Sequence, residues 1–310
     1  MKIKSLVTLL LVLLLLSLFF NVKSILKTDE PWFVSFPDAN SRPTYDTYHH
    51  IKEAQKLSTG KGIKVGILGK YFGYKNNKNI YSGGKDFTGN TEAFNDIGEH
   101  GLWMATTLKE IAPDVEIYAL CARNNDHSVE AKAISEAVDW AIENDIDILT
   151  YSAQAFSEEY REEIDKAVRK AIEHNIVTTF IHYDIPGNIL PFGFFPYSPK
   201  SYARETDLNV FHFDYNVLLL FSYKNYLESG RNVGNNIGAH PYFSNSSMSP
   251  VLAGIVAMMK EINNGLPASE YKRILKETSY ELVYNGYKVK HVVDALGAVN
   301  YLLRANNEGS

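Results

Sequence analysis

The chain has 310 residues, a formal net charge of −5 and a single cysteine, Cys121. One cysteine permits no internal disulfide, and its apolar neighbours predict a small buried hydrophobic side chain. An acidic chain is not expected to bind nucleic acid, because phosphate contacts need clustered lysine and arginine. The length suits one large α/β domain or two small ones, and the sequence has no repeat or Pro/Gly-rich linker, which favours one.

Residues 1–24 have the organisation of a targeting segment. Two lysines precede an apolar run over residues 6–20, and the small residues Val22 and Ser24 suit positions −3 and −1 of a cleavage site. This pattern predicts a secretory signal peptide cleaved after Ser24. The run is slightly short for a spanning helix of about 20 residues, and an uncleaved N-terminal anchor is the alternative. Both place the body of the protein outside the cytoplasm, secreted or extracytoplasmic, with membrane contact only if the segment is retained.

The rest of the chain is expected to comprise a lead-in, one domain and a tail, at residues 25–47, 48–305 and 306–310. The sequence is polar and irregular up to residue 59. Regular patterning begins at Gly60, and we expect the folded core to begin near this point.

Strand-like and helical segments alternate through the first half of the domain. Short apolar runs predict strands, and apolar residues at three-to-four spacing predict amphipathic helices. The expected strands are residues 63–68, 115–122, 146–151 and 176–183, and the expected helices are residues 100–111, 129–144 and 158–175. This alternation predicts a parallel sheet joined by right-handed crossovers and covered by helices on both faces.

The second half of the domain has weaker patterning. We expect a loop over residues 186–199, one or two strands over residues 209–223, and helices over residues 250–262, 268–283 and 292–303. In a parallel sheet, functional groups gather at the carboxyl ends of the strands. Gly69, Ser152 and Asp184 fall at such ends, so we expect them to border a functional site.

Six segments resemble, in their order and spacing, those of the subtilisin-like (subtilase, peptidase S8) serine peptidases. They are Gly60-Lys61-Gly62-Ile63-Lys64-Val65-Gly66-Ile67-Leu68, which resembles the first core strand; the histidine motif around Glu99-His100-Gly101; and residues 112–119, 137–149, 246–254 and 292–299. The resemblance covers roughly residues 48–305. It implies a three-layer α/β fold, with a mostly parallel sheet covered by helices on both faces, and descent from enzymes of proteolysis, which are hydrolases.

The resemblance also assigns catalytic positions. His100 corresponds to the general base, and Ser246 or Ser247 to the nucleophile, but Gly69 stands where the family has its triad aspartate. A serine hydroxyl needs a base, and the base needs a carboxylate that fixes its tautomer and stabilises its protonated form. In subtilisin, loss of this aspartate lowers kcat by roughly 10⁴-fold. Gly69 has no side chain to supply either effect.

Two serines compete for the position of the nucleophile. Alignment backward from Ser249-Pro250 without a gap selects Ser246, whereas alignment on Met248 selects Ser247 at the cost of a deletion. A deletion in the first turn of a helix would rotate everything after it by about 100°, which favours Ser246. Both serines also suit the simpler role of capping the helix that follows.

Carboxylates elsewhere in the chain could replace the missing aspartate. The sequence offers Asp96, Glu99 and Asp184 for this role. For His100 itself, the simpler alternative is a polar residue that opens a helix.

The oxyanion site and the substrate groove also depart from the pattern. Counting from the fourth strand places Asp184 at the oxyanion position, where a carboxylate would repel a developing negative charge. Asn188 supplies the expected amide if four extra residues are admitted, and its alternative is a turn residue. Ser152-Ala153-Gln154 stands where the family has Ser-Leu-Gly, which adds bulk where a substrate peptide would lie as an added strand.

These departures predict a serine endopeptidase homologue that is a pseudopeptidase and acts by binding a peptide or protein. The alternatives are an active or slow secreted endopeptidase that uses His100 with Ser246 or Ser247, and an α/β domain similar to the family in fold alone. No cofactor is expected. Neither His49-His50 nor the pair His182 and Asp184 has the spacing of a metal site. Calcium, which family members often bind, finds no support in this sequence.

Overall fold

The computed structural model describes only part of the chain. The described residues are 48–153, 158–181, 183–194, 208–211, 245–284 and 287–308. The expected targeting segment and lead-in, Gln154 and His182 lie outside them, as does most of the expected strand region 209–223.

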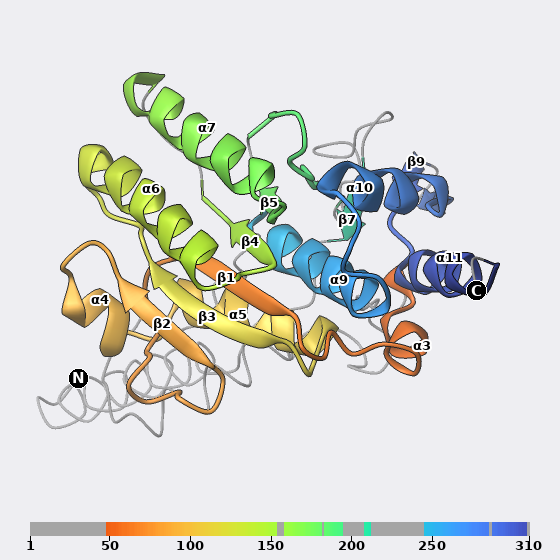
Figure 1. The fold of residues 1–310 in the computed structure, drawn as a ribbon, viewed down its shortest axis with the longest axis horizontal. Helices are drawn as coiled ribbons and strands as arrows, with labels where there is room; N and C mark the ends of the chain where they lie inside the picture. The colour runs from red at the N-terminus through yellow and green to blue at the C-terminus, as the bar shows by residue number, and fades with distance from the viewer. Residues whose placement is uncertain are drawn as a thin grey trace, which may run out of the picture. The chain divides into compact units, whose positions relative to one another are not determined.

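Five parallel strands form the main sheet. They are β1 (Lys64–Gly69), β2 (Gly83–Asp86), β3 (Glu116–Cys121), β4 (Ile148–Tyr151) and β5 (Val177–Phe180). Their order is β2-β3-β1-β4-β5, so β1 is central and its end lies between those of β3 and β4 (Figure 1). The parallel sheet predicted from the alternating pattern is confirmed. The strand β2 was not predicted, because its sequence Gly-Gly-Lys-Asp lacks the β-branched and aromatic residues typical of strands.

Helices cover both faces of this sheet. The helices α6 (His127–Glu143) and α7 (Glu158–Glu173) pack on one face, and α5 (His100–Ile111) and α9 (Met248–Ile262) pack on the other (Figure 1). Because successive strand residues point to opposite faces, Leu68 and Leu149 join the α6/α7 cluster, whereas Val65 and Ile148 join the α5/α9 cluster. The result is the three-layer α/β fold expected from the sequence.

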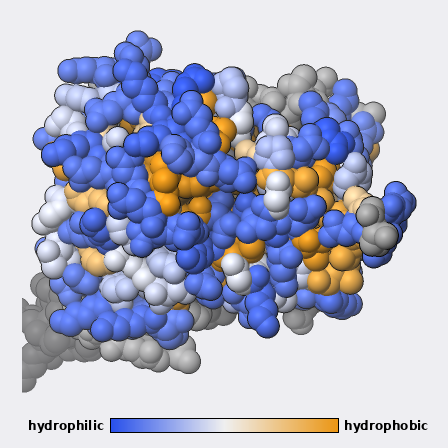
Figure 2. Space-filling model, viewed as in Figure 1, coloured by the Kyte–Doolittle hydropathy of each residue, from blue (hydrophilic) through white to orange (hydrophobic). Residues whose placement is uncertain are grey.

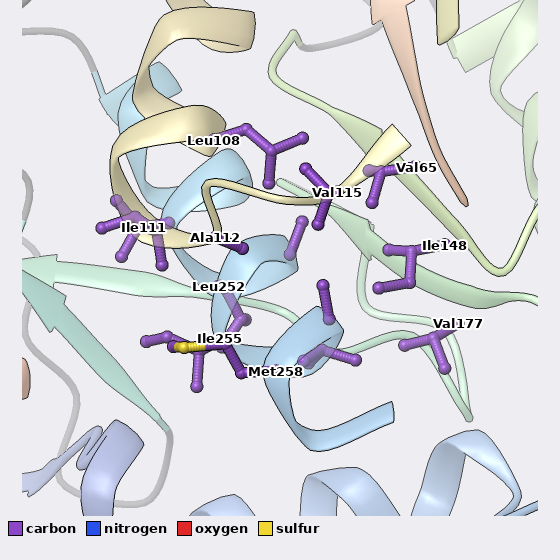
Figure 3. Close-up of a cluster of buried hydrophobic side chains, with 14 of the residues drawn as sticks. Val65, Leu108, Ile111, Ala112, Val115, Ile148, Val177, Leu252, Ile255 and Met258 are labelled. Atoms are coloured by element: carbon purple, nitrogen blue, oxygen red, sulfur yellow. The ribbon is translucent and has the colours of Figure 1, made fainter. Parts of the chain in front are cut away.

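The main apolar core lies between the sheet and the helices α5 and α9. Figure 3 shows Val65, Ile148 and Val177, from three neighbouring strands, in one cluster with side chains of α5 and α9. All thirteen residues from Met248 to Lys260 of α9 are buried, as expected for a helix enclosed by the sheet and other helices. Complete burial of each large aliphatic side chain contributes about 1.5–3 kcal/mol, so this helix is a major source of stability.

A second sheet lies in the C-terminal part. It has four strands in the order β6-β7-β9-β8: β6 (Phe192–Phe194), β7 (Asn209–Phe211), β9 (Tyr287–Val292) and β8 (Tyr280–Tyr284). Three expectations are therefore wrong. The loop expected over residues 186–199 contains the strand β6. The helix expected over residues 268–283 is shorter and is α10 (Ala268–Glu277). The helix expected over residues 292–303 begins three residues later, as α11 (Ala295–Glu308).

Antiparallel pairing of β8 with β9 explains the two helix errors. Residues 280–284 are mainly aromatic and aliphatic, and pairing with β9 holds them as a strand despite their helix-compatible spacing. Two short helices, α3 (Ile51–Gln55) and α4 (Thr91–Asn95), and a 3-10 helix, η4 (Asn245–Ser247), complete the described elements. The helix α3 falls in the stretch expected to be irregular, and α11 runs past the domain end expected at residue 305.

The surface in the view of Figure 2 is mainly hydrophilic, with hydrophobic side chains in patches between the helices. Within the part of the chain that the structure describes, no helix is both long and apolar enough to span a bilayer.

Candidate active site

Backbone hydrogen bonds join the start of α5 to the two residues that follow β1. The amides of Gly101 and Leu102 donate to the carbonyls of Lys70 and Tyr71, at 2.8 and 3.2 Å. A Cβ at Gly101 would lie 2.8 Å from the Lys70 carbonyl oxygen, so this close approach requires glycine. The loop after β1 thereby places His100, the first residue of α5, beside the carboxyl edge of the main sheet.

The helix that carries the serines begins at the same edge. The helix α5 contacts both α9 and the short 3-10 helix η4 (Asn245–Ser247) that precedes it. A Cβ at Gly254, midway along α9, would meet Ile111 at 2.7 Å and Leu108 at 3.3 Å, both in the last turns of α5. The two helices therefore run in the same direction, and their first residues lie at one end.

His100 lacks the partner that a catalytic base requires. Its Nδ1 atom is buried and has no hydrogen-bond partner among the described residues. Burial, together with the positive charges of Arg123 and Lys70, lowers the pKa of His100 to about 4. At neutral pH the imidazole is uncharged and a much weaker base than one that a carboxylate stabilises.

A phenylalanine ring fills the space beside Gly69. A Cβ at Gly69 would lie 3.4 Å from Cζ of Phe72, and the same ring lies against Gly101. Phe72 is fully buried and packs edge-on to Tyr81 and Phe94, with ring centroids 6.0 and 6.4 Å away. An apolar ring thus lies next to the end of β1, where the resemblance to the subtilisin-like peptidases leads us to expect the triad carboxylate.

The carboxylates that could have replaced the aspartate do not bond to His100. Asp96, Glu99 and Asp184 all lie in the described part of the chain, and within it none donates or accepts a hydrogen bond at His100 Nδ1. Asp184 is exposed, and Asp96 and Glu99 are only partly buried. Glu99 is the N-cap residue of α5 and makes no side-chain cap bond.

The serine segment is bonded to the end of β4. Ser246 Oγ donates to the Ser152 carbonyl at 3.2 Å, and Ser152 Oγ donates to the Ser246 carbonyl at 2.7 Å. One turn later, Ser249 Oγ donates to the Tyr151 carbonyl at 3.4 Å. The Ser246 hydroxyl proton is therefore directed to a backbone oxygen. Ser247 is the N-cap residue of α9, but its side chain makes no cap hydrogen bond.

The residues expected in the substrate groove lie at this same edge. Ser152 and Ala153 directly follow β4 and are 6% exposed each. Ala153 packs with the apolar cluster under α6 and α7. The third residue of the expected groove, Gln154, is outside the described residues.

The side chain of Asn188 is hydrogen-bonded to backbone groups of Phe180 and Tyr183. Its Oδ1 accepts from the Phe180 amide at 3.0 Å, and its Nδ2 donates to the carbonyls of Phe180 and Tyr183 at 2.9 and 2.8 Å. The side chain is 1% exposed. Both amide protons are used, so this conformation leaves none for an oxyanion.

The structure provides no metal site in the described residues. Within them, no three His, Cys, Asp or Glu side chains are placed to hold an ion. His49 Nδ1 instead bonds to the Val293 carbonyl at 2.7 Å, and His50 Nδ1 to Asp294 Oδ1 at 3.0 Å. These two histidines join α3 to the start of α11.

Comparisons with known proteins agree with the fold. No protein-family model matches the chain. The chain is 27% identical over 137 residues to the minor extracellular protease Epr of Bacillus subtilis (strain 168), a match that covers 41% of this chain and only 21% of Epr. It is 24% identical over 229 residues to an intracellular serine protease of Paenibacillus polymyxa, covering 66% of this chain and 68% of that protein.

A solved structure extends the comparison to the tertiary level. The crystal structure of MycP1 with its N-terminal propeptide removed matches with a TM-score of 0.59 at 14% identity, covering 84% of this chain and 98% of MycP1. Fold and site together define a three-layer α/β protein that presents a histidine-bearing helix and a serine-bearing helix at one sheet edge. In sequence the chain is similar to these two serine proteases, and in fold it is similar to MycP1, which agrees with the resemblance to the subtilisin-like peptidases.

Three residues of this site were not singled out from the sequence. Phe72, Lys70 and Arg123 lie in irregular segments after β1 and β3. Their spacing along the chain carries no motif, and only the pairing of β1 with β3 brings them to one place.

Proposed function

We propose that this protein is a pseudopeptidase, a subtilisin-like scaffold that has lost peptide hydrolysis and binds a peptide or protein at the carboxyl edge of its main sheet. The observation that carries this proposal is the buried Nδ1 of His100 without a hydrogen-bond partner among the described residues. Without a carboxylate on this atom, neither the tautomer nor the imidazolium is stabilised. A pKa of about 4 further limits its use as a base at neutral pH.

Two neighbouring features support the loss of hydrolysis. The apolar ring of Phe72, rather than a carboxylate, lies beside Gly69. The Ser246 hydroxyl donates to a backbone carbonyl of β4, a bond that it would have to break before transferring its proton to His100. Asn188, with both amide protons donated to carbonyls, adds no oxyanion donor.

The second candidate is a slow endopeptidase that uses His100 with Ser246 or Ser247. The observation in its favour is that α5 and α9 begin at the same edge, which keeps the base and the serines in the same region. Activity would then rest on serine and histidine alone, at a rate far below that of a complete triad.

We also propose an extracytoplasmic location, with residues 1–24 as a signal peptide or N-terminal anchor. The charged and apolar pattern of this segment supports it. Of the two curated relatives, one is named as extracellular and the other as intracellular, so the segment itself is the stronger support.

Labelling with a fluorophosphonate probe tests the proposal, because the probe reacts only with an activated serine. The full chain is compared with Gly69→Asp, Ser246→Ala and Ser247→Ala, and an active subtilisin serves as positive control. Gly69→Asn is the matched control for Gly69→Asp, since it adds the same bulk without the charge. Circular dichroism melts establish that each variant is folded.

We expect no labelling of the wild type and none of Gly69→Asn. Labelling that appears in Gly69→Asp would mean a scaffold disarmed mainly at one position. If no folded variant is labelled, Phe72 and the hydrogen bonds of the serines also prevent activation of the serine. Wild-type labelling that is lost in one serine variant would overturn the pseudopeptidase proposal in favour of the second candidate.

A further inference from the structure

Two cationic side chains flank the vacant position at Gly69. Lys70 follows Gly69 directly, and the backbone amide of Arg123 donates to the Gly69 carbonyl at 3.1 Å across the β1–β3 pair. The Lys70 ammonium donates to Asn125 Oδ1 at 2.9 Å, in the segment that continues from Arg123. Both cations therefore stand at the carboxyl edge of the sheet, beside the start of α5.

The positive charges reach the two sides of the proposed peptide site. Arg123 and Lys70 both lower the pKa of His100, which opens α5. Arg123 also lowers the pKa of Tyr151, the last residue of β4, against the larger upward effect of burial and of Glu130. Tyr151 directly precedes Ser152. The positive charge of Arg123 thus influences both His100 and Tyr151.

Two carboxylates near this edge, Asp86 and Glu130, are bonded to other groups. Asp86 accepts from the amide and the hydroxyl of Thr88, at 2.9 and 2.8 Å. Glu130 accepts from the Tyr151 hydroxyl, and its other oxygen lies 3.7 Å from His127 Nδ1. In the described part of the chain, neither Lys70 nor Arg123 forms an ion pair.

These two cations without an ion-pair partner occur in a chain whose net charge is −5. The ion pairs of the described residues lie elsewhere, as between Lys132 and Glu136 on the exposed side of α6. An unpaired, partly buried guanidinium favours a carboxylate, which it can bind through two parallel hydrogen bonds. A site that lost its own carboxylate at Gly69 but kept two cations is suited to receive a carboxylate from outside.

We infer that the peptide or protein bound at this edge is acidic, with a glutamate or aspartate side chain held between Lys70 and Arg123 beside His100. This inference rests on the proposed function and adds the chemical class of the ligand. The cations would also speed the encounter with an acidic segment at low ionic strength.

Fluorescence anisotropy with three labelled peptides tests this inference. The probes are Gly/Ser decapeptides of identical length that carry four Glu, four Gln or four Lys residues, titrated with the full chain at low and at moderate salt. The variants are Lys70→Gln and Arg123→Gln, singly and combined. Lys132→Gln is the matched control, because it removes an equal charge from the exposed face of α6.

We expect the Glu peptide to bind at least about tenfold more tightly than the Gln peptide, equivalent to about 1.4 kcal/mol, and the Lys peptide to bind least. Arg123→Gln with Lys70→Gln should abolish the preference and its salt dependence, and Lys132→Gln should retain both. A C-terminal amide on the Glu peptide should not change its affinity, since side-chain carboxylates are the proposed ligands.

Other outcomes overturn the inference in distinguishable ways. Equal affinity for the Glu and Gln peptides, lost when Ser152 and Ala153 are replaced by bulky residues, would refute the acidic ligand and retain peptide binding at the edge. A Glu preference that survives removal of both cations would place the acidic site elsewhere. No binding of any peptide would refute the acidic ligand together with the peptide-binding part of the proposed function, and fluorophosphonate labelling would still report separately on hydrolysis.

Discussion

The ring of Phe72 lies against the backbone of Gly69, with Cζ 3.4 Å from the position that a Cβ there would take. This is ordinary van der Waals contact, and Gly69 does not have a positive φ. The end of β1 therefore has room for a methyl group beside the ring. Four predictions follow from this and related contacts.

Alanine should be tolerated at Gly69 and not at Gly101. We expect Gly69→Ala to change the free energy of unfolding by less than about 1 kcal/mol, because its Cβ meets only the far edge of a ring. Gly101→Ala should cost about 1–3 kcal/mol, since its Cβ would lie 2.8 Å from a backbone oxygen and 2.7 Å from Phe72. Urea unfolding of both variants checks this, and equal costs would contradict the packing described for the β1–α5 junction.

The burial of His100 should make stability depend on pH. Its pKa is about 4 in the folded protein against an ordinary value of 6.5. The unfolded state therefore takes up a proton first as the pH falls, so the stabilisation is present above pH 6.5 and is lost between pH 6.5 and 4. We expect the wild type to lose up to about 3 kcal/mol more than His100→Gln over this interval.

Denaturant unfolding of wild type and His100→Gln at several pH values measures this difference directly, because titrations at other sites are common to both proteins. Parallel stability curves for the two proteins between pH 6.5 and 4 would mean that His100 is not held neutral by its surroundings.

The two hydrogen bonds between Ser152 and Ser246 should contribute to the stability of the folded protein. Ser152→Ala and Ser246→Ala each remove one hydrogen bond to a buried carbonyl, and we expect each to destabilise the protein by about 1–2 kcal/mol. Ser135→Ala, on the partly exposed side of α6, is the control and should stay within about 0.5 kcal/mol. Thermal melts measure all three. A stabilising effect of Ser246→Ala would instead indicate a serine kept for chemistry at a cost in stability.

Asn188 should be needed for folding stability. Asn188→Ala leaves the Phe180 amide and two carbonyls without their bonds, and we expect a loss of about 2–4 kcal/mol. Asn76→Ala, at an exposed loop position, should change stability little. Urea unfolding makes the comparison. If Asn188→Ala left stability unchanged but altered labelling by the fluorophosphonate probe, the oxyanion role would have to be restored.

The strands and helices of the first half of the domain were predicted well from the sequence, and those of the second half were predicted less well. Continuous apolar runs and three-to-four spacing predicted β1, β3, β4 and the helices α5, α6 and α7 within a few residues. Such patterns reflect burial between layers, and each is contained within one short stretch of the sequence. The strand β2 was not predicted because pairing with β3, rather than its own composition, holds it extended. The strand β8 was not predicted because its spacing is compatible with a helix, and antiparallel pairing with β9 holds it extended.

The sequence by itself determined the resemblance to the subtilisin-like peptidases and the presence of a glycine at position 69, because motif order and residue identity are properties of the chain. Only the tertiary structure decided what surrounds His100. The fold brings Phe72, Lys70 and Arg123 to one edge through the pairing of β1 with β3 and the bonds from the start of α5, and it commits the Asn188 amide to its own loop. Burial, charge and hydrogen-bond partners depend on neighbours distant in sequence, which a local pattern does not specify.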